Sequence, residues 1–338
     1  MPRIRVLIFT CSLVVFAGHV TAQPQHFEAA IETLAQKLQT SYVIPEVGAR
    51  YAAMLRQELV RGAYRDLRDA TGAARRLTAD LQAVAEDGHL RVEPEANAHF
   101  GPGGLGARRG PPGAARLKAL SNARWIAPGV AYVCFNEFPG DPATVAATDR
   151  FMLQHASAKA LIIDARTHRG GGMREMSVML PYLYASETLL VAMDVAQSIV
   201  HERGAPPDEG PSVRPATGPV GRLRRQHFAI PHPTERRLFD VQVYYLTSQR
   251  TASAAEHLAF ALQRTHRAVL IGEATAGANH FGGFESIGEA LMAFIPVGRT
   301  LDPMTGRDWE RTGVQPDIAV PANRALDEAL RLARRDAR

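Results

Sequence analysis

The sequence predicts an α/β protein in which a largely parallel sheet follows a small helical unit. After Trp125, short apolar segments alternate with helical stretches, a pattern typical of a parallel sheet covered by helices. Between Phe27 and about Ala85, apolar residues instead recur at helical spacing. A stretch rich in Gly and Pro separates these two regions. We therefore expect four segments: a signal peptide at 1–22, a helical domain at 23–95, a linker at 96–122 and an α/β domain at 123–338.

The first residues are typical of a secretory signal peptide. Arg3 and Arg5 precede an apolar run that ends near Gly18, and Val20-Thr21-Ala22 is a small-residue cleavage site. The apolar run is too short to span a bilayer stably, and no later run reaches the necessary length. We expect an exported protein, periplasmic or secreted, that is cleaved near Ala22.

In the helical domain, the periodicity predicts helices over about 27–38, over about 51–59 after Pro45, and over about 67–84. The linker that follows contains a Gly-x-Gly-x-x-Gly match at Gly101, Gly103 and Gly106. No predicted strand precedes this match and a proline interrupts it, so we interpret it as a linker and not as a nucleotide site.

The elements of the α/β domain are predicted from its apolar runs. The expected strands cover 130–134, 160–163, 189–193, 241–246 and 268–271, and the expected helices cover 142–154, 174–184 and 253–263, with a closing helix from about 323. Residues 204–221 are rich in Pro and Gly and are expected to form a long loop.

Composition excludes several functions. The formal net charge of +5 becomes +3 without Arg3 and Arg5, and the basic residues are scattered, so nucleic-acid binding is not expected. The chain lacks His-Glu-x-x-His, Cys-x-x-Cys, Walker and Gly-x-Ser-x-Gly motifs, and its twelve histidines do not cluster at ligand spacing. We expect no metal and no cofactor. Cys134, the only cysteine after the signal peptide, is expected to be a buried, unreactive thiol.

Two stretches have the features of a reactive site. Ser253 and Glu256 form a Ser-x-x-Glu capping box at a predicted helix start, where a serine either caps the helix or acts as a nucleophile near the positive end of its dipole. Earlier, the strand ending at Asp164 leads into Gly170, Gly171 and a third glycine before a helix, which either makes a tight turn or leaves amides open for an oxyanion. Both turns are expected at one end of the parallel sheet, where such sheets bind ligands.

The order of four motifs resembles the C-terminal-processing, or tail-specific, serine peptidase family. Its closest likeness is to the branch with the tricorn core peptidase and the repeats of interphotoreceptor retinoid-binding protein. The motifs are D164-A-R-T-H-R-G-G171, L246-T-S-Q-R-T-A-S-A-A-E256, I271-G-E-A-T-A-G277 and W309-E-R-T-G-V-Q-P-D-I318, and the segments Y42-V-I-P-E46 and D87-G-H-L90 resemble the N-terminal domain of that branch. This resemblance implies a crotonase- or ClpP-like α/β core sheet with flanking helices and a helical cap.

The resemblance also implies roles for individual residues. Ser253 would be the nucleophile, His89 its general base and Glu310 the carboxylate of the site, and the amide of Ala254 with that of Gly170 or Gly171 would hold the oxyanion. An imidazole can take the serine proton and return it to the leaving amine while two amides bind the developing charge. The expected substrate is a peptide or protein.

The sequence departs from the family in three places. The bacterial branch with a Ser-Lys dyad has its lysine about 25 positions after the serine, where this chain has Ala278. Ala165 and His168 stand where the family has Leu and Asn. No peptide-binding module fits between His89 and Trp125.

Other interpretations stay open. Asp87 is also expected to hold the turn that follows it, while Glu273 and Asp317 are rival carboxylates that we expect to serve turns. The absent dyad lysine allows a binding protein of the same fold that holds a small apolar ligand or a peptide. A crotonase-type acyl-thioester enzyme is a third possibility, which export to a compartment without coenzyme A disfavours.

Overall fold

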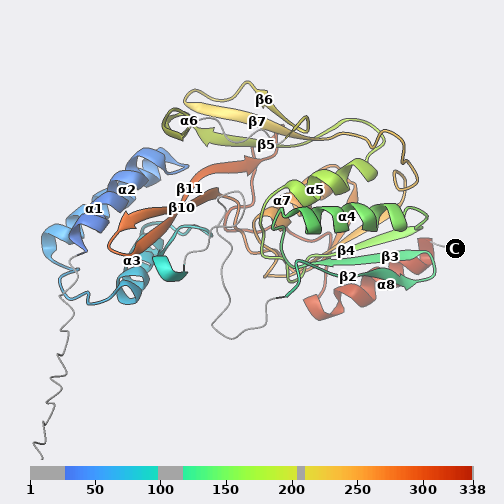
Figure 1. Ribbon diagram of the computed structural model, residues 1–338, viewed down its shortest axis with the longest axis horizontal. Coiled ribbons are helices and arrows are strands. Elements are labelled where there is room, and N and C mark those ends of the chain that lie inside the picture. Colours follow the sequence, from blue (N-terminus) through green and yellow to red (C-terminus); the bar gives the residue numbers. More distant parts are fainter. Residues whose placement is uncertain (1–26, 98–116, 204–209, 337–338) are drawn as a thin grey trace, which may run out of the picture.

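The computed structural model describes residues 27–97, 117–203 and 210–336 (Figure 1). The predicted signal peptide and most of the predicted linker lie outside these residues. Two six-stranded sheets organise the described chain, one mainly parallel and one antiparallel. Figure 1 shows them at opposite ends of the molecule, with the N-terminal helices beside the antiparallel sheet.

The parallel sheet has the strand order β12-β9-β8-β4-β3-β2, and only the edge strand β2 runs antiparallel to its neighbour. Its strands in chain order are β2 (Leu120–Ala127), β3 (Val130–Phe135), β4 (Ala160–Asp164), β8 (Gln242–Thr247), β9 (Ala268–Gly272) and β12 (Ile318–Ala319). The central strands are apolar at nearly every position because both faces of the sheet are covered.

Helices lie on both faces of the parallel sheet. One face packs against α4 (Pro142–Gln154), α5 (Arg174–Met179) and α7 (Ala254–Arg264), and the other against α8 (Ala325–Asp336). Alternate residues of each strand supply the two cores, so Leu161 and Ile163 face α4 and α7 while Ile162 faces α8. Short 3-10 turns follow α5 (η2, Leu180–Tyr182) and precede α8 (η3, Ala322–Arg324).

The antiparallel sheet has the order β1-β11-β5-β7-β6, with β10 paired to β11. Its strands are β1 (Arg91–Pro94), β5 (Thr188–Ala196), β6 (Val213–Ala216), β7 (Arg222–Ala229), β10 (Phe281–Gly288) and β11 (Leu291–Leu301), with α6 (Gln197–Arg203) after β5 and a 3-10 turn η1 (Glu95–Asn97) after β1. Strand β1 comes from the N-terminal region and pairs with β11, so the backbone of the helical unit joins this sheet.

The N-terminal helices are α1 (Glu28–Ser41), α2 (Pro45–Arg61) and α3 (Ala70–Val84). Their buried face includes Ile31, Leu34 and Leu38, which share one apolar core with Ile295 and Val297 of β11. Pro45 is the first residue of α2, a position that tolerates proline because the missing amide would have no helical acceptor. No helix among the described residues is long and apolar enough to cross a membrane.

The predicted α/β architecture is confirmed, with two corrections. Residues 189–193 do form a strand, but β5 belongs to the antiparallel sheet because its partners are β7 and β11. The expected loop at 204–221 contains the strand β6, which pairs with β7. Strands β10 and β11 were not predicted. Cys134 is buried, as expected, and burial raises the pKa of its thiol.

Candidate active site

Three loops meet at the carboxyl end of the parallel sheet, after β4, β8 and β9. The Thr251 hydroxyl donates to the Ala165 carbonyl at 2.8 Å, and the Ala252 amide donates to the His168 carbonyl at 3.0 Å, so the β8 loop is fixed to the β4 loop. The Ala276 amide donates to the Thr251 carbonyl at 2.9 Å, which adds the β9 loop. This edge is where open α/β sheets bind ligands.

Ser253 lies in this loop cluster, directly before α7. Its φ of 58° and ψ of −120° are costly for a residue with a side chain, and such strain is concentrated at functional sites. A sharp strand-to-helix turn exposes a nucleophilic hydroxyl in the α/β-hydrolases. The side chain is half-buried and belongs to a capping box with Glu256, and the Glu256 amide also donates to the Ser253 carbonyl at 2.8 Å. The helix start therefore does not depend on the hydroxyl alone.

Glu256 forms the other half of the capping box and holds the Ser253 backbone. One carboxylate oxygen accepts from the amides of Ser253 at 2.7 Å and Ala278 at 2.9 Å. The other accepts from the Thr275 hydroxyl at 2.6 Å and the Gly277 amide at 2.7 Å. Glu256 is fully buried, and burial raises the pKa of this carboxyl to about 7 although the hydrogen bonds oppose the change.

The glycine loop after β4 packs against Ser253. A Cβ added to Gly170, whose φ is 109°, would lie 2.7 Å from the Ser253 Cβ and 3.2 Å from its Oγ. Only glycine permits this approach. Among the described residues, the amides of Gly171 and Ala254 have no acceptor, and Ala254 is the first residue of α7. One of these amides directly follows the serine at the positive end of a helix dipole, and the other belongs to the glycine loop that packs against the serine through Gly170.

His168, which stands where the resembling family has asparagine, has a structural role in the glycine loop. The Gly170 amide donates to its Nδ1 at 3.0 Å, so this amide is not open for a ligand. The ring is fully buried, and burial lowers the pKa of His168 to about 3, which keeps it neutral and able to accept this bond. Of the three amides predicted for the oxyanion, Gly171 and Ala254 are the open pair.

The turn that contains His89 is fixed by backbone hydrogen bonds. Asp87 accepts from the amides of His89 and Leu90, both at 2.8 Å, which agrees with its expected role in this turn. The Gln82 side chain bonds the amide of Asp87 and the carbonyls of Asp87 and Leu90. Gly88 also packs against the β9 loop, because a Cβ added there would lie 2.9 Å from the Ala278 Cα.

The His89 ring makes no hydrogen bond to any other part of the chain that the structure describes. It stacks on Phe294 with 5.2 Å between ring centroids, and its buried Nδ1 has no partner among the described residues. Burial lowers the pKa of His89 to about 4, although Asp87 opposes the change. The contacts connect its turn to Ser253 through Ala278 and Glu256, because the amides of Ala278 and Ser253 donate to the same Glu256 oxygen.

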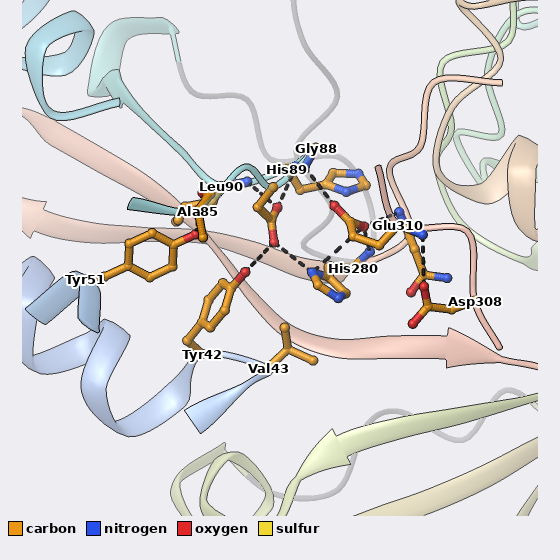
Figure 2. A network of polar contacts seen from close by, with 12 residues as sticks. Tyr42, Val43, Tyr51, Ala85, Gly88, His89, Leu90, His280, Asp308 and Glu310 are labelled. Atoms are coloured by element: carbon orange, nitrogen blue, oxygen red, sulfur yellow. Dashed lines mark hydrogen bonds and ion pairs between the residues drawn. The ribbon is translucent and has the colours of Figure 1, made fainter. Parts of the chain in front are cut away.

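Glu310 lies beside the His89 turn, and its carboxylate binds backbone amides. One oxygen accepts from the Gly88 amide at 2.9 Å, and the other accepts from the amides of Asn279 at 2.7 Å and His280 at 2.9 Å. Figure 2 shows Glu310 between the turn at Gly88 and the segment at His280. Among the described residues, no hydrogen bond joins its carboxylate to the ring of His89, and burial raises the pKa of Glu310.

His280 is a site component that we did not expect from the sequence. Its Nδ1 lies 2.7 Å from Asp87 and 3.8 Å from Glu310, and the Tyr42 hydroxyl donates to the same Asp87 oxygen at 2.7 Å (Figure 2). The sequence offered two features of this network, which are Asp87 in D87-G-H-L90 and Tyr42 in Y42-V-I-P-E46. Their connection to His280 forms only on folding.

The rival carboxylates lie elsewhere and hold backbone, as expected. Glu273 accepts from the Ala322 amide at 3.0 Å, and Asp317 accepts from the Leu270 amide at 2.8 Å. Away from the loop cluster, a pocket of about 400 Å³ lies between η2 and the end of β7. Its lining is mainly apolar and includes Leu180, Tyr182, Phe228 and Ile230.

Comparisons with known proteins agree with this architecture. A curated carboxyl-terminal-processing protease from Picosynechococcus sp. is 24% identical over 192 residues, which cover 57% of this chain and 39% of that protein. This chain therefore matches less than half the length of that relative. The solved structure of a photosystem II D1 C-terminal processing protease has a TM-score of 0.54 at 16% identity, covering 91% of this chain and 98% of that one. A lipoprotein from Streptococcus agalactiae has a TM-score of 0.55 at 12% identity, covering 94% and 99%. At these identities the two structures share the fold.

Two family models cover the chain in the order of the predicted segments. The N-terminal domain of Peptidase_S41 in eukaryotic IRBP matches residues 16–103. Peptidase family S41 matches residues 129–320, which is more than half of the chain. The chain belongs to peptidase family S41, a family of serine peptidases.

Proposed function

We propose that this chain is a serine peptidase that cleaves peptide or protein substrates through an acyl-enzyme on Ser253. The observation that carries the proposal is the strained serine at the start of α7, which packs against Gly170 and is followed by the Ala254 amide, an amide without an acceptor among the described residues. Membership of family S41 supports the same reaction class.

In the proposed reaction, the Ser253 oxygen attacks the substrate carbonyl carbon, and His89 takes the serine proton. The carbonyl oxygen becomes negative and accepts hydrogen bonds from the amides of Gly171 and Ala254. The C–N bond then breaks, and His89 returns the proton to the leaving amine. Water attacks the resulting ester, with His89 again as base, and regenerates the serine. The His89 ring stacks on Phe294, and no hydrogen bond among the described residues joins it to Ser253, so the reaction needs a movement that brings the ring to the serine hydroxyl.

We assign Glu310 a different task from that of a carboxylate bonded to a histidine ring. Its hydrogen bonds to Gly88, Asn279 and His280 support a role in fixing the turn that carries His89. The site is therefore proposed as Ser253 and His89 in the chemistry, with Glu310 holding the base in place.

The proposal is tested by peptide hydrolysis with Ser253→Ala protein. We expect loss of activity by about a thousandfold or more with an unchanged circular dichroism spectrum. Ser186→Ala, at an exposed position, is the matched control and should retain full activity. Equal hydrolysis by the Ser253→Ala and wild-type proteins would contradict the assignment.

A second candidate function is favoured by the apolar pocket of about 400 Å³ near Tyr182 and Phe228. A cavity of this size and lining suits a small apolar ligand. Native mass spectrometry of protein purified from its own host should then detect a bound molecule that a Phe228→Asp variant lacks. An empty protein with measurable turnover would exclude this function.

We also propose export, on the basis of Arg3, Arg5 and the apolar run before Ala22. Expression in a bacterial host with a secretion system should yield a mature protein whose first residue is near Gln23. Intact mass measurement decides this, and a full-length cytoplasmic product would contradict it.

A further inference from the structure

Two carboxylates, Asp87 buried and Glu310 partly buried, and the His280 imidazole connect the N-terminal unit to the β9 loop. The ligand atoms of Asp87, His280 and Glu310 all lie within 4.8 Å of one another. Asp87 belongs to the turn after α3, His280 precedes β10, and Glu310 follows β11, so three segments distant in sequence meet here. Figure 2 shows the side chains of His280 and Glu310 next to each other, and the Tyr42 hydroxyl of the N-terminal unit donates to Asp87.

Donors already surround these carboxylates. Asp87 accepts from the amides of His89 and Leu90, from Tyr42 and from His280 Nδ1. Glu310 accepts from three amides, one in the His89 turn and two in the β9 loop. The His280 ring contacts Asp87 directly and lies 3.8 Å from Glu310. Of the three side chains Asp87, Glu310 and His280, only His280 can carry a positive charge.

We propose that His280 is a positioning residue, whose ring between Asp87 and Glu310 holds the turn 87–90 and thereby the candidate base His89 against the β9 loop. The inference rests on the proposed function for its catalytic consequence. Its structural part, that His280 fixes the turn, stands on the contacts alone.

The electrostatics explain why an imidazole suits this position. Burial disfavours the charged ring, but the hydrogen bond to Asp87 and the charges of Glu310, Asp87 and Asp308 outweigh it and raise the pKa of His280. The other groups that face the ring are the Tyr42 phenol, in edge contact at 6.3 Å between centroids, and the neutral ring of His89. Burial would raise the pKa of Asp87, but the bond from His280 lowers it overall. A protonated His280 therefore balances two carboxylates.

Loss of this charge has a defined consequence. Asp87 and Glu310 would then face each other at less than 5 Å without a cation, and like charges at this distance in a buried site repel strongly. Either one carboxylate takes up a proton or the turn moves away from the β9 loop. Both outcomes change the position of His89.

The same three residues could be considered as metal ligands, but their hydrogen bonds favour the positioning role of His280. A metal would have to displace the His280 proton at Nδ1 and compete with the amide and phenol donors for the carboxylate oxygens. Metal binding is therefore kept as an outcome of the test.

The test is His280→Asn in the full-length protein, because the asparagine amide can donate from the position of Nδ1 but carries no charge. His266→Asn is the matched control, since His266 is exposed and its left-handed backbone tolerates asparagine. Hydrogen exchange of a peptide covering 86–92, the kcat and KM for peptide hydrolysis, and the pH profile are measured for both variants and for the wild type.

We expect the His280→Asn protein to exchange the amides of 88–90 faster and to lose kcat by about tenfold to a hundredfold with little change in KM. Wild-type kcat should decline as pH rises through the raised pKa of His280, and the variant should lack this decline. The His266→Asn protein should match the wild type in every measurement.

Three results would overturn the inference. These are unchanged protection of the turn, reduced protection with unchanged kcat, or a stoichiometric metal that elemental analysis finds in the wild type and EDTA removes together with activity. If hydrolysis proved independent of Ser253, the proposed function would fall, but the exchange measurement would still decide whether His280 holds the turn.

Discussion

At the scale of single residues, Ser253 shows how one backbone conformation serves two purposes. Its backbone carbonyl accepts from the amides of Glu256 at 2.8 Å and His257 at 3.0 Å, and its own amide donates to the Glu256 carboxylate at 2.7 Å. A helix start is therefore maintained without the serine side chain. The hydroxyl lies next to the Ala254 amide, for which the described residues offer no acceptor.

Gly170→Ala should damage the site through contact with the serine. The added Cβ would lie 2.7 Å from the Ser253 Cβ, so we expect hydrolysis to fall by about a hundredfold. Gly210→Ala is the control, because Gly210 also has positive φ but has no atom within 4 Å of its added Cβ. Both variants should lose about 1–3 kcal/mol of stability from backbone strain. Equal activity of the two variants would argue against close packing at Gly170.

The pH profile tests the state of His89. Burial lowers its pKa to about 4, and a general base must be unprotonated, so kcat/KM should stay high down to about pH 5 and fall with a midpoint near 4. The profile is measured with a substrate that does not titrate in this range. A midpoint near 6.5 would mean that the base is exposed to solvent or is another group.

Single residues were predictable where a motif surrounds them and unpredictable where folding supplies the partner. Ser253, Gly170 and Gly171 lie at strand-to-helix turns that the pattern of apolar runs reveals. His280 has no such context, because its partner Asp87 is 193 positions away. The bonding of Glu310 to amides instead of to an imidazole also depends on how two distant loops meet.

At the scale of elements, the start of α7 depends on a buried carboxyl. Glu256 accepts three hydrogen bonds from the β9 loop and a fourth from the Ser253 amide at the start of α7, so a change of its ionisation affects both. The amides of Ser253 and Ala278 donate to the same carboxylate oxygen. A glutamine at this position could accept these two hydrogen bonds only with its single carbonyl oxygen.

The raised pKa of Glu256 predicts a pH dependence of stability. A carboxyl whose pKa rises to about 7 on folding favours the folded state below about pH 4.5 and loses this contribution as pH increases to 7. We expect the free energy of unfolding of the wild type, relative to Glu256→Gln, to decrease by on the order of 3 kcal/mol over this range. Urea titrations at several pH values measure the difference, in which the buried histidines cancel. A difference that is constant with pH would contradict it.

Element prediction succeeded where both faces of a strand are buried. Strands β3, β4, β8 and β9 are short apolar runs between helices, and the sequence places them within a few residues. Strands β10 and β11 were not predicted from the sequence because β10 is rich in glycine and β11 contains Pro296 and Gly298. Glycine and proline are unfavourable in strands, and here long pairing between the two strands outweighs that preference.

At the scale of the whole molecule, the helical unit and the antiparallel sheet form one core. Leu34 and Leu38 of α1 pack with Ile295 and Val297 of β11, and β1 adds a strand from the helical unit to the same sheet. The cap is thus held by apolar burial as well as by the contacts around Asp87. The sequence predicts the helices, but their packing partner is the sheet that was not foreseen.

Leu34→Ala should therefore destabilise the protein as a unit. The side chain is fully buried, and its truncation leaves a cavity that costs about 2–5 kcal/mol. Val60→Ala, at a position 87% exposed, should change stability by less than about 0.5 kcal/mol. Urea unfolding followed by circular dichroism measures both. Wild-type stability of the Leu34→Ala protein would contradict a shared core.

The most direct test of the central claim is covalent labelling of Ser253 by a fluorophosphonate probe, followed by tryptic digestion and mass spectrometry. The tryptic peptide Thr251–Arg264 contains Ser253 as its only serine, so the adduct is assigned without ambiguity. We predict that this peptide carries the probe in the wild type and in Ser186→Ala, and that the label disappears in Ser253→Ala and after heat denaturation. An unlabelled peptide from folded protein that nevertheless hydrolyses peptides would contradict the assignment of Ser253 as the nucleophile.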